Sequence, residues 1–103
     1  MQTFTYLLCG CLLHEDSTGN AGTLGPGDMQ WMTAGCGLVH AEMPGSFDEA
    51  AEGFQVWLNL DRNNKYCRPK YQEIRAADVV EVQTDQFKAK VLAGSVDGVY
   101  SQI

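Results

Sequence analysis

The stretch that decides the fold is LGPGDMQWMTAGCGLVHAEMPG, residues 24–45. Residues 25–28, Gly-Pro-Gly-Asp, have the composition of a tight turn. We expect a strand over 38–43, and its two-residue period places His40 and Glu42 on one face. An imidazole and a carboxylate so placed can reach a single ion, as in His/carboxylate metal sites. The spacing alone leaves open a hydrogen-bonded histidine beside a solvated glutamate.

Short strands separated by turns extend over the rest of the chain. The most regular is 54–60, where Phe54, Val56, Leu58 and Leu60 alternate with other residues. Segment 71–77 is expected to be irregular or helical, and 47–52 a helical turn. Further strands are expected from β-branched and aromatic content at 3–8, 11–14, 29–33, 79–82 and 87–92. One domain of 103 residues with this pattern predicts an all-β sandwich or barrel of the jelly-roll type.

Charge and composition narrow the function classes. The net charge is −6, and all seven basic residues lie between Arg62 and Lys90, so we expect no direct contact with nucleic acid. No segment resembles a signal peptide or a membrane span, so we expect no membrane association and a cytoplasmic or nuclear location, or both. The cysteines are then expected to be thiols. They are Cys9, Cys11, Cys36 and Cys67, and Cys9-Gly10-Cys11 lacks the second pair of a typical zinc site.

Several of these segments together resemble the pirin family of the cupin superfamily. GPGDMQWMTAGCGLVHAEMP is similar to the family pattern P-G-D-x-Q-W-M-T-A-G-R-G-x-x-H-x-E-M-P, and GFQVWLNL and PKYQEI match the next two blocks. The resemblance continues through TYLLCGCLLHEDSTGNAG and VLAGSVDGVYSQI. It implies that residues 1–103 are one N-terminal cupin domain, truncated at both ends. The jelly roll would be incomplete, and the second cupin domain of the family is absent.

The resemblance also implies a metal. Pirins are expected to hold one Fe²⁺ by three histidines and one glutamate, and His40 and Glu42 match two of these ligands. The other two belong to an H-x-H-R-G-F motif just before the strand expected at 3–8. This chain has two histidines, and the second, His14, matches no ligand of the family. We expect His14 to lie at a strand end.

Three functions follow from the resemblance and the residues. The first is quercetin 2,3-dioxygenase-type oxidation of a flavonol-type small molecule, with Glu42 as a possible base; the missing His-x-His ligands would impair it in this chain. The second is a non-enzymatic nuclear role as a transcription cofactor that acts through transcription-factor partners. The third is a truncated domain that self-associates through exposed strand edges. Cys36, which replaces the arginine of A-G-R-G, removes a planar cation that would favour the second function.

Overall fold

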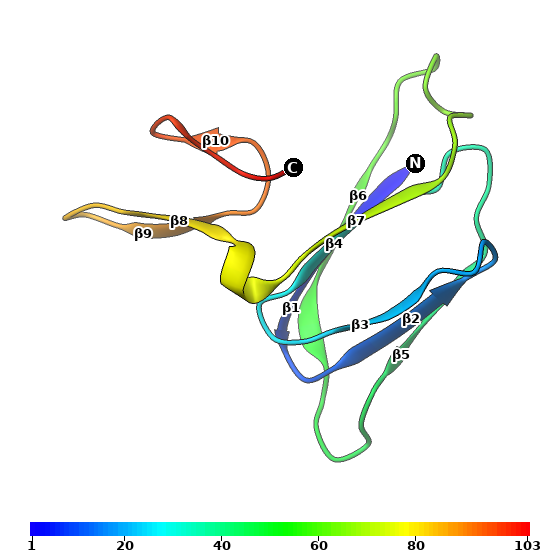
Figure 1. Cartoon of the computed structure of the whole chain (residues 1–103), viewed down its shortest axis with the longest axis horizontal. Coiled ribbons are helices and arrows are strands. Elements are labelled where there is room, and N and C mark those ends of the chain that lie inside the picture. The colour runs from blue at the N-terminus through cyan, green and yellow to red at the C-terminus, as the bar shows by residue number, and fades with distance from the viewer.

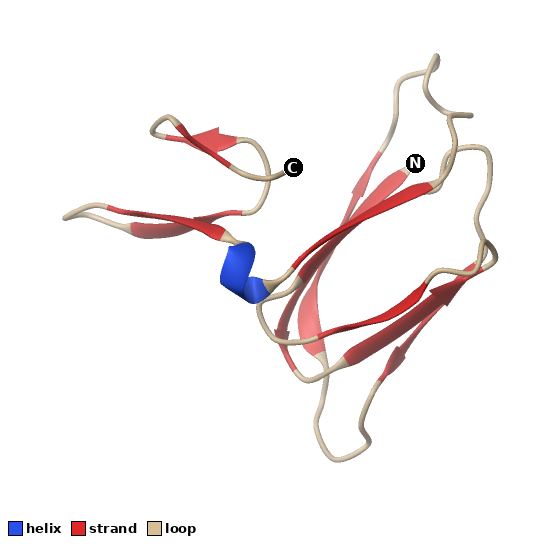
Figure 2. Ribbon diagram, viewed as in Figure 1, coloured by secondary structure: helices blue, strands red, loops and turns tan.

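The computed structural model describes residues 1–103, and it consists of β-strands joined by turns (Figure 2). Its only helical element is a short 3-10 turn, η1 (Ala76–Asp78), and no helix has the length and apolar character needed to cross a bilayer. The all-β class is confirmed. The strands are β1 (Gln2–Cys9), β2 (Leu12–Asp16), β3 (Ala21–Leu24), β4 (Met29–Thr33), β5 (His40–Pro44), β6 (Glu52–Leu58), β7 (Lys70–Ile74), β8 (Val80–Gln83), β9 (Lys88–Val91), β10 (Ser95–Val96) and β11 (Val99–Tyr100).

Two antiparallel sheets form the main body. A four-stranded sheet of order β6-β1-β4-β7 faces a three-stranded sheet of order β3-β2-β5, and the hairpins β8-β9 and β10-β11 extend to one side (Figure 1). The two large sheets do not close into a barrel. The Cα radius of gyration of 14.9 Å exceeds the roughly 13 Å of a compact domain of this length. The structure therefore has the shape of an incomplete barrel.

The inner face of the larger sheet is partly polar. Along β1, Thr3, Thr5 and Leu7 are buried and point between the sheets. The antiparallel register places Thr3 opposite Met32 and Thr5 opposite Gln30 on β4, and all these side chains are buried. The apolar core is correspondingly small, with Leu7, Leu24, Met29, Met32, Ile74, Val82 and Val91 as its buried members. Polar groups at its centre therefore need partners within the protein.

Strand β6 has the predicted alternation, but its apolar face points outward. Phe54 is 63% exposed and Val56 is 48% exposed, whereas Gln55 lies on the inner face. The register explains this, because Thr5 of the inner face pairs directly with Gln55 and directly opposed residues share a face. Since β6 is the last strand of its sheet, its outer face and its free edge are both uncovered.

Four segments differ from the predictions. Residues 71–77, expected to be irregular or helical, contain most of β7, because Lys70–Ile74 pairs with β4 along its whole length. The helical turn expected at 47–52 is wrong, since this segment is a bend that leads into β6. The strand expected at 38–43 begins only at His40, and β3 was not anticipated. Strand β7 arises from pairing with β4, and β3 arises from pairing with its neighbour β2, neither of which the local pattern indicates.

Candidate functional site

Strand β5 carries His40 and Glu42 at alternate positions. Its register with β2 places Asp16 opposite His40 and His14 opposite Glu42. Because directly opposed residues share a face, these four positions form one group on the small sheet. Contacts from this group to β6 and β7 show that the shared face is the inner one. The structure thus brings two histidines and two carboxylates to neighbouring positions between the sheets.

Glu42 is half-buried and oriented by the opposite sheet. The Gln55 side-chain amide donates to Glu42 Oε2 at 3.1 Å and to Thr5 Oγ1 at 3.3 Å. Trp57 Nε1 donates in turn to Gln55 Oε1 at 3.0 Å, which fixes the direction of the amide. The Glu42 carboxylate lines a small open pocket with Thr5, Leu7, Leu12, Ala51, Gly53, Phe54 and Gln55. Glu42 therefore lies at a pocket that a ligand can enter.

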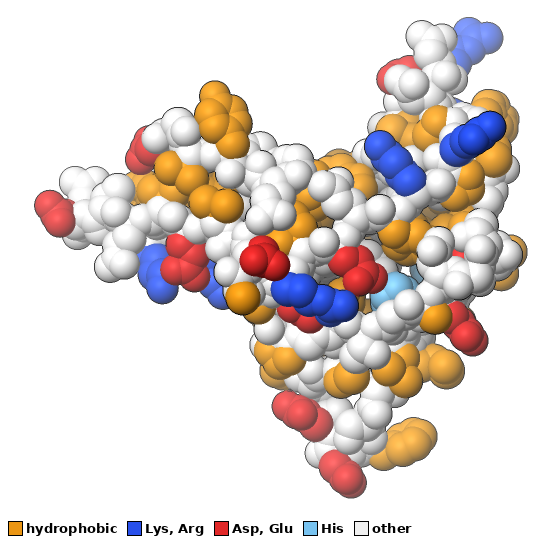
Figure 3. Space-filling view, viewed as in Figure 1, with side chains coloured by type: hydrophobic (Ala, Val, Ile, Leu, Met, Phe, Trp, Pro, Cys, Tyr) orange, Lys and Arg blue, Asp and Glu red, His pale blue; other side chains and the backbone are white.

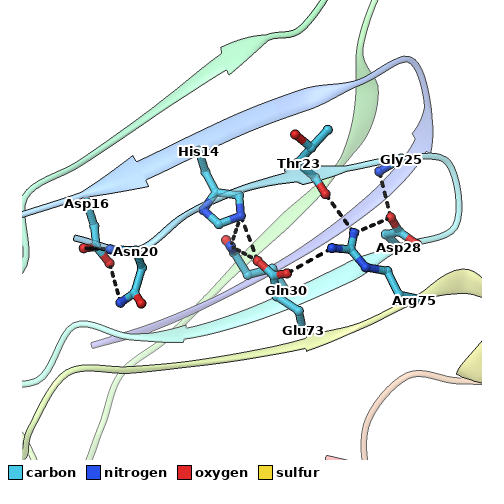
Figure 4. A network of polar contacts seen from close by, with 9 residues as sticks. All are labelled: His14, Asp16, Asn20, Thr23, Gly25, Asp28, Gln30, Glu73 and Arg75. Carbon is cyan, nitrogen blue, oxygen red and sulfur yellow. Dashed lines mark hydrogen bonds and ion pairs between the residues drawn. The ribbon is translucent and has the colours of Figure 1, made fainter. Parts of the chain in front are cut away.

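His14 occupies the middle of β2, not a strand end as predicted, and is buried. Its Nε2 lies 2.7 Å from Glu73 Oε1, and the Gln30 amide donates to the same oxygen at 3.2 Å (Figure 4). The imidazole stacks on Tyr71 with ring centroids 6.0 Å apart. Gly22, which pairs with His14 on β3, leaves room for the ring, because a Cβ there would lie 2.7 Å from Nε2. His14 therefore joins the two sheets through a buried polar contact.

Two ion pairs of Arg75, the residue after β7, continue this network. Arg75 contacts Glu73 at 3.5 Å and Asp28 at 3.0 Å (Figure 4). Asp28 also accepts hydrogen bonds from the backbone N–H groups of Gly25 and Ala76, both at 2.8 Å. Burial acts to raise the pKa of Asp28, but these N–H donors and the Arg75 guanidinium hold that pKa below its usual value. The ionised carboxylate thus links the turn before β4 to η1.

The inner face is rich in negative charge around Tyr71. Burial, together with the carboxylates of Asp16, Glu42 and Glu73, raises the pKa of the Tyr71 hydroxyl, so the phenol stays protonated. On the outer surface drawn in Figure 3, by contrast, acidic and basic side chains are interspersed. The interior therefore favours a cation or a ligand that donates hydrogen bonds.

The four grouped side chains are not equally available to a metal. His14 is held by Glu73, and Asp16 accepts a hydrogen bond from the Asn20 amide at 3.1 Å. No group of three or more His, Cys, Asp and Glu side chains meets in a geometry that could hold a metal ion. His40, which is exposed, and Glu42 thus offer two donors. The residues present do not fit a four-ligand iron site by themselves.

Sequence reasoning missed the partners of these residues. The alternation of 54–60 did place Gln55 and Trp57 on one face, but it did not indicate that this face is the inner one. The Glu73 partner of His14 lies on β7, which was not predicted as a strand. Both contacts depend on sheet register, which a single sequence does not specify.

The open two-sheet architecture and its polar inner face define an incomplete cupin-type barrel. The Pirin family model matches residues 1–58, which is more than half of the chain. The chain belongs to the pirin family. This confirms the resemblance drawn from its sequence blocks.

Relatives and solved structures agree with this assignment. Rat pirin is 43% identical over 103 residues, and a putative quercetin 2,3-dioxygenase of Pseudomonas aeruginosa is 44% identical over 97 residues. These matches cover 99% and 93% of this chain but 35% and 34% of the relatives. A crystal structure of quercetin 2,3-dioxygenase from Acinetobacter baumannii superposes with a TM-score of 0.86 at 35% identity, over 99% of this chain and 38% of that one. The chain therefore spans about a third of the length of its curated relatives.

Proposed function

We propose that this chain forms one wall of a metal-dependent, quercetin 2,3-dioxygenase-type centre. In this centre His40 and Glu42 contribute two ligands of a ferrous ion. The observation that supports the proposal is the Glu42 carboxylate, which accepts a hydrogen bond from Gln55 of the opposite sheet and belongs to a residue that lines the pocket. The relatives named quercetin 2,3-dioxygenase support the reaction class. The remaining ligands would come from the H-x-H-R-G-F motif that the family resemblance places just before β1.

Glu42 is also the candidate base. A flavonol presents an acidic hydroxyl, and a carboxylate within hydrogen-bond reach can accept its proton. Gln55 keeps the carboxylate turned toward the space between the sheets. The protonated Tyr71 and the surrounding carboxylates favour ligands that carry donor groups. A bound ferrous ion would add Lewis-acid activation of the same hydroxyl.

The activity belongs, in this proposal, to the longer protein. Two donors on one strand do not fix the coordination geometry of a metal, and the other inner-face candidates are engaged. The isolated residues 1–103 are therefore expected to be impaired both in iron retention and in turnover.

Metal retention tests the proposed role of Glu42. The chain is loaded anaerobically with ferrous iron and dialysed, and its iron content is measured. We expect weak, substoichiometric retention that is lost in Glu42→Ala. Glu15→Ala is the matched control, because Glu15 is an exposed carboxylate of the same strand pair, opposite Ala41, on the other face of β2 from His14. Equal iron content in both variants would contradict the role of Glu42.

A further inference from the structure

The loop between β4 and β5 contacts the loop between β6 and β7, although the two are distant in sequence. The Cys36 backbone N–H donates to the Cys67 carbonyl oxygen at 2.8 Å. Between β4 and β5, Gly35 adopts a positive φ of 54°, and a Cβ at this glycine would collide with the same carbonyl. The loop before β5 therefore lies directly against the loop between β6 and β7.

This contact holds the backbones of two cysteine residues against each other. In an antiparallel sheet, residues that exchange two backbone N–H···O bonds have Cα atoms about 5.5 Å apart, and the single bond between Cys36 and Cys67 likewise keeps their two backbones close. Disulfides span Cα separations of roughly 4.4–6.8 Å. Cys36 is exposed and Cys67 is half-buried, and both are free thiols in the structure. Such a pair offers one accessible thiol that an oxidant can reach and a second, half-buried thiol on the adjoining loop.

We infer that Cys36 and Cys67 form a reversible disulfide when the chain meets a disulfide oxidant such as glutathione disulfide. The Cys36 thiolate attacks one sulfur of glutathione disulfide, forms a mixed disulfide and releases one glutathione thiolate. The Cys67 thiolate then displaces the second glutathione and closes the Cys36–Cys67 bond. Two electrons pass from the cysteines to glutathione disulfide, and the two thiol protons end on two glutathione molecules.

The other two cysteines have different surroundings. Cys9 Sγ lies 3.8 Å from the Ala50 carbonyl oxygen and 3.7 Å from Glu52 Oε2, and Cys11 packs against Gly45. They lie on either side of the turn that joins β1 to β2. The bridge we infer would instead fix the loop that leads into β5 and its residues His40 and Glu42. Redox state would thereby alter the freedom of one side of the candidate site.

Peptide mapping distinguishes this bridge from other pairings. The chain has no lysine or arginine before Arg62, so trypsin leaves Cys9, Cys11 and Cys36 in the fragment 1–62. Cys67 falls in the fragment 66–70, because the Arg68–Pro69 bond resists trypsin. The folded chain is treated with glutathione disulfide, its free thiols are alkylated, and it is digested without reduction. We expect two thiols to be lost per chain and 66–70 to be linked to 1–62.

Variants assign the linkage to the inferred pair. The linkage should persist in Cys9→Ser/Cys11→Ser and disappear in Cys36→Ser, and reduction with dithiothreitol should restore both thiols. The same treatment in urea is the control for folding, and we expect the linkage to form at least tenfold more slowly there. An alkylated, unlinked 66–70 fragment from the oxidised folded chain would overturn the inference. So would a linkage that survives in Cys36→Ser, or one that forms as fast in urea.

Discussion

At the scale of single residues, His14 packs closely against Gly22 on the inner face. A Cβ at position 22 would lie 2.7 Å from His14 Nε2, the atom that contacts Glu73. We expect Gly22→Ala to lower the free energy of unfolding by about 1–3 kcal/mol, because the imidazole must leave its contact with Glu73. Urea unfolding followed by tryptophan fluorescence measures this change.

A double-mutant cycle identifies the origin of that cost. In a His14→Ala background the clash has no partner, so Gly22→Ala should be close to neutral. An undiminished cost in that background would show that the methyl group is unfavourable for another reason.

Of the candidate site, the sequence predicts the features that depend on local alternation and misses those that depend on contacts between strands. The two-residue period correctly placed His40 and Glu42 on one face of a strand, because alternation is a local property. The sequence could not predict the hydrogen bond from Gln55 to Glu42, because this bond requires the register of β6 against β1. His14 was misplaced because β2 continues through Glu15 and Asp16, which pair with β5. The proposed metal role of His40 and Glu42 stays a prediction.

At the scale of elements, Asp28 joins the turn before β4 to η1 and Arg75. Its pKa is depressed in the folded chain, so its ionised form stabilises the fold at pH values above its unfolded pKa of about 3.9. This stabilisation is lost as the pH falls below that value and through the lower folded pKa. We expect Asp28→Asn to cost about 1–3 kcal/mol at pH 7. Denaturant titrations of both proteins from pH 7 to pH 2 measure the difference.

The pH dependence of that difference is the decisive observation. The difference in unfolding free energy between the unmodified chain and Asp28→Asn should shrink toward zero at acidic pH. Protonated Asp28 no longer offers a charged acceptor to Arg75 and the backbone N–H groups. The other carboxylates contribute equally to both proteins and cancel. A difference that stays constant across the whole range would contradict the assigned network.

Strands were predictable to different degrees. Alternating or β-branched segments such as 3–8, 29–33 and 54–60 appear as β1, β4 and β6 with shifts of one or two residues at most ends. Strand β3, with the sequence AGTL, carries no such signal and exists because it pairs with β2. Strand β7 likewise depends on β4. Local pattern thus predicted the strands that carry their own signal, and tertiary pairing decided the others.

At the scale of the whole molecule, the open barrel leaves the outer face and the edge of β6 uncovered. We propose that a second copy of the chain covers this strand, because unpaired backbone groups and exposed Phe54 and Val56 lie together there. The chain should sediment as a dimer or larger species at micromolar concentration. Val56→Lys should shift it to monomer, since it places a charge in the contact.

A matched variant tests the location of the contact. Val39 is 76% exposed in the loop before β5 and is not part of β6, so Val39→Lys should leave the oligomeric state unchanged. A monomeric unmodified chain, or equal effects of the two lysine variants, would contradict association through β6.

The most direct test of the whole account restores the ligands that the family resemblance places before β1. An H-x-H-R-G-F segment, with alanine as x, is fused ahead of Gln2, and ferrous iron binding is measured anaerobically by titration calorimetry. We predict that the extended chain binds iron at least about tenfold more tightly than residues 1–103, and that Glu42→Ala removes this gain. An extended chain that binds no more tightly, or a gain that survives Glu42→Ala, would contradict a metal centre built on the inner face of this half-barrel.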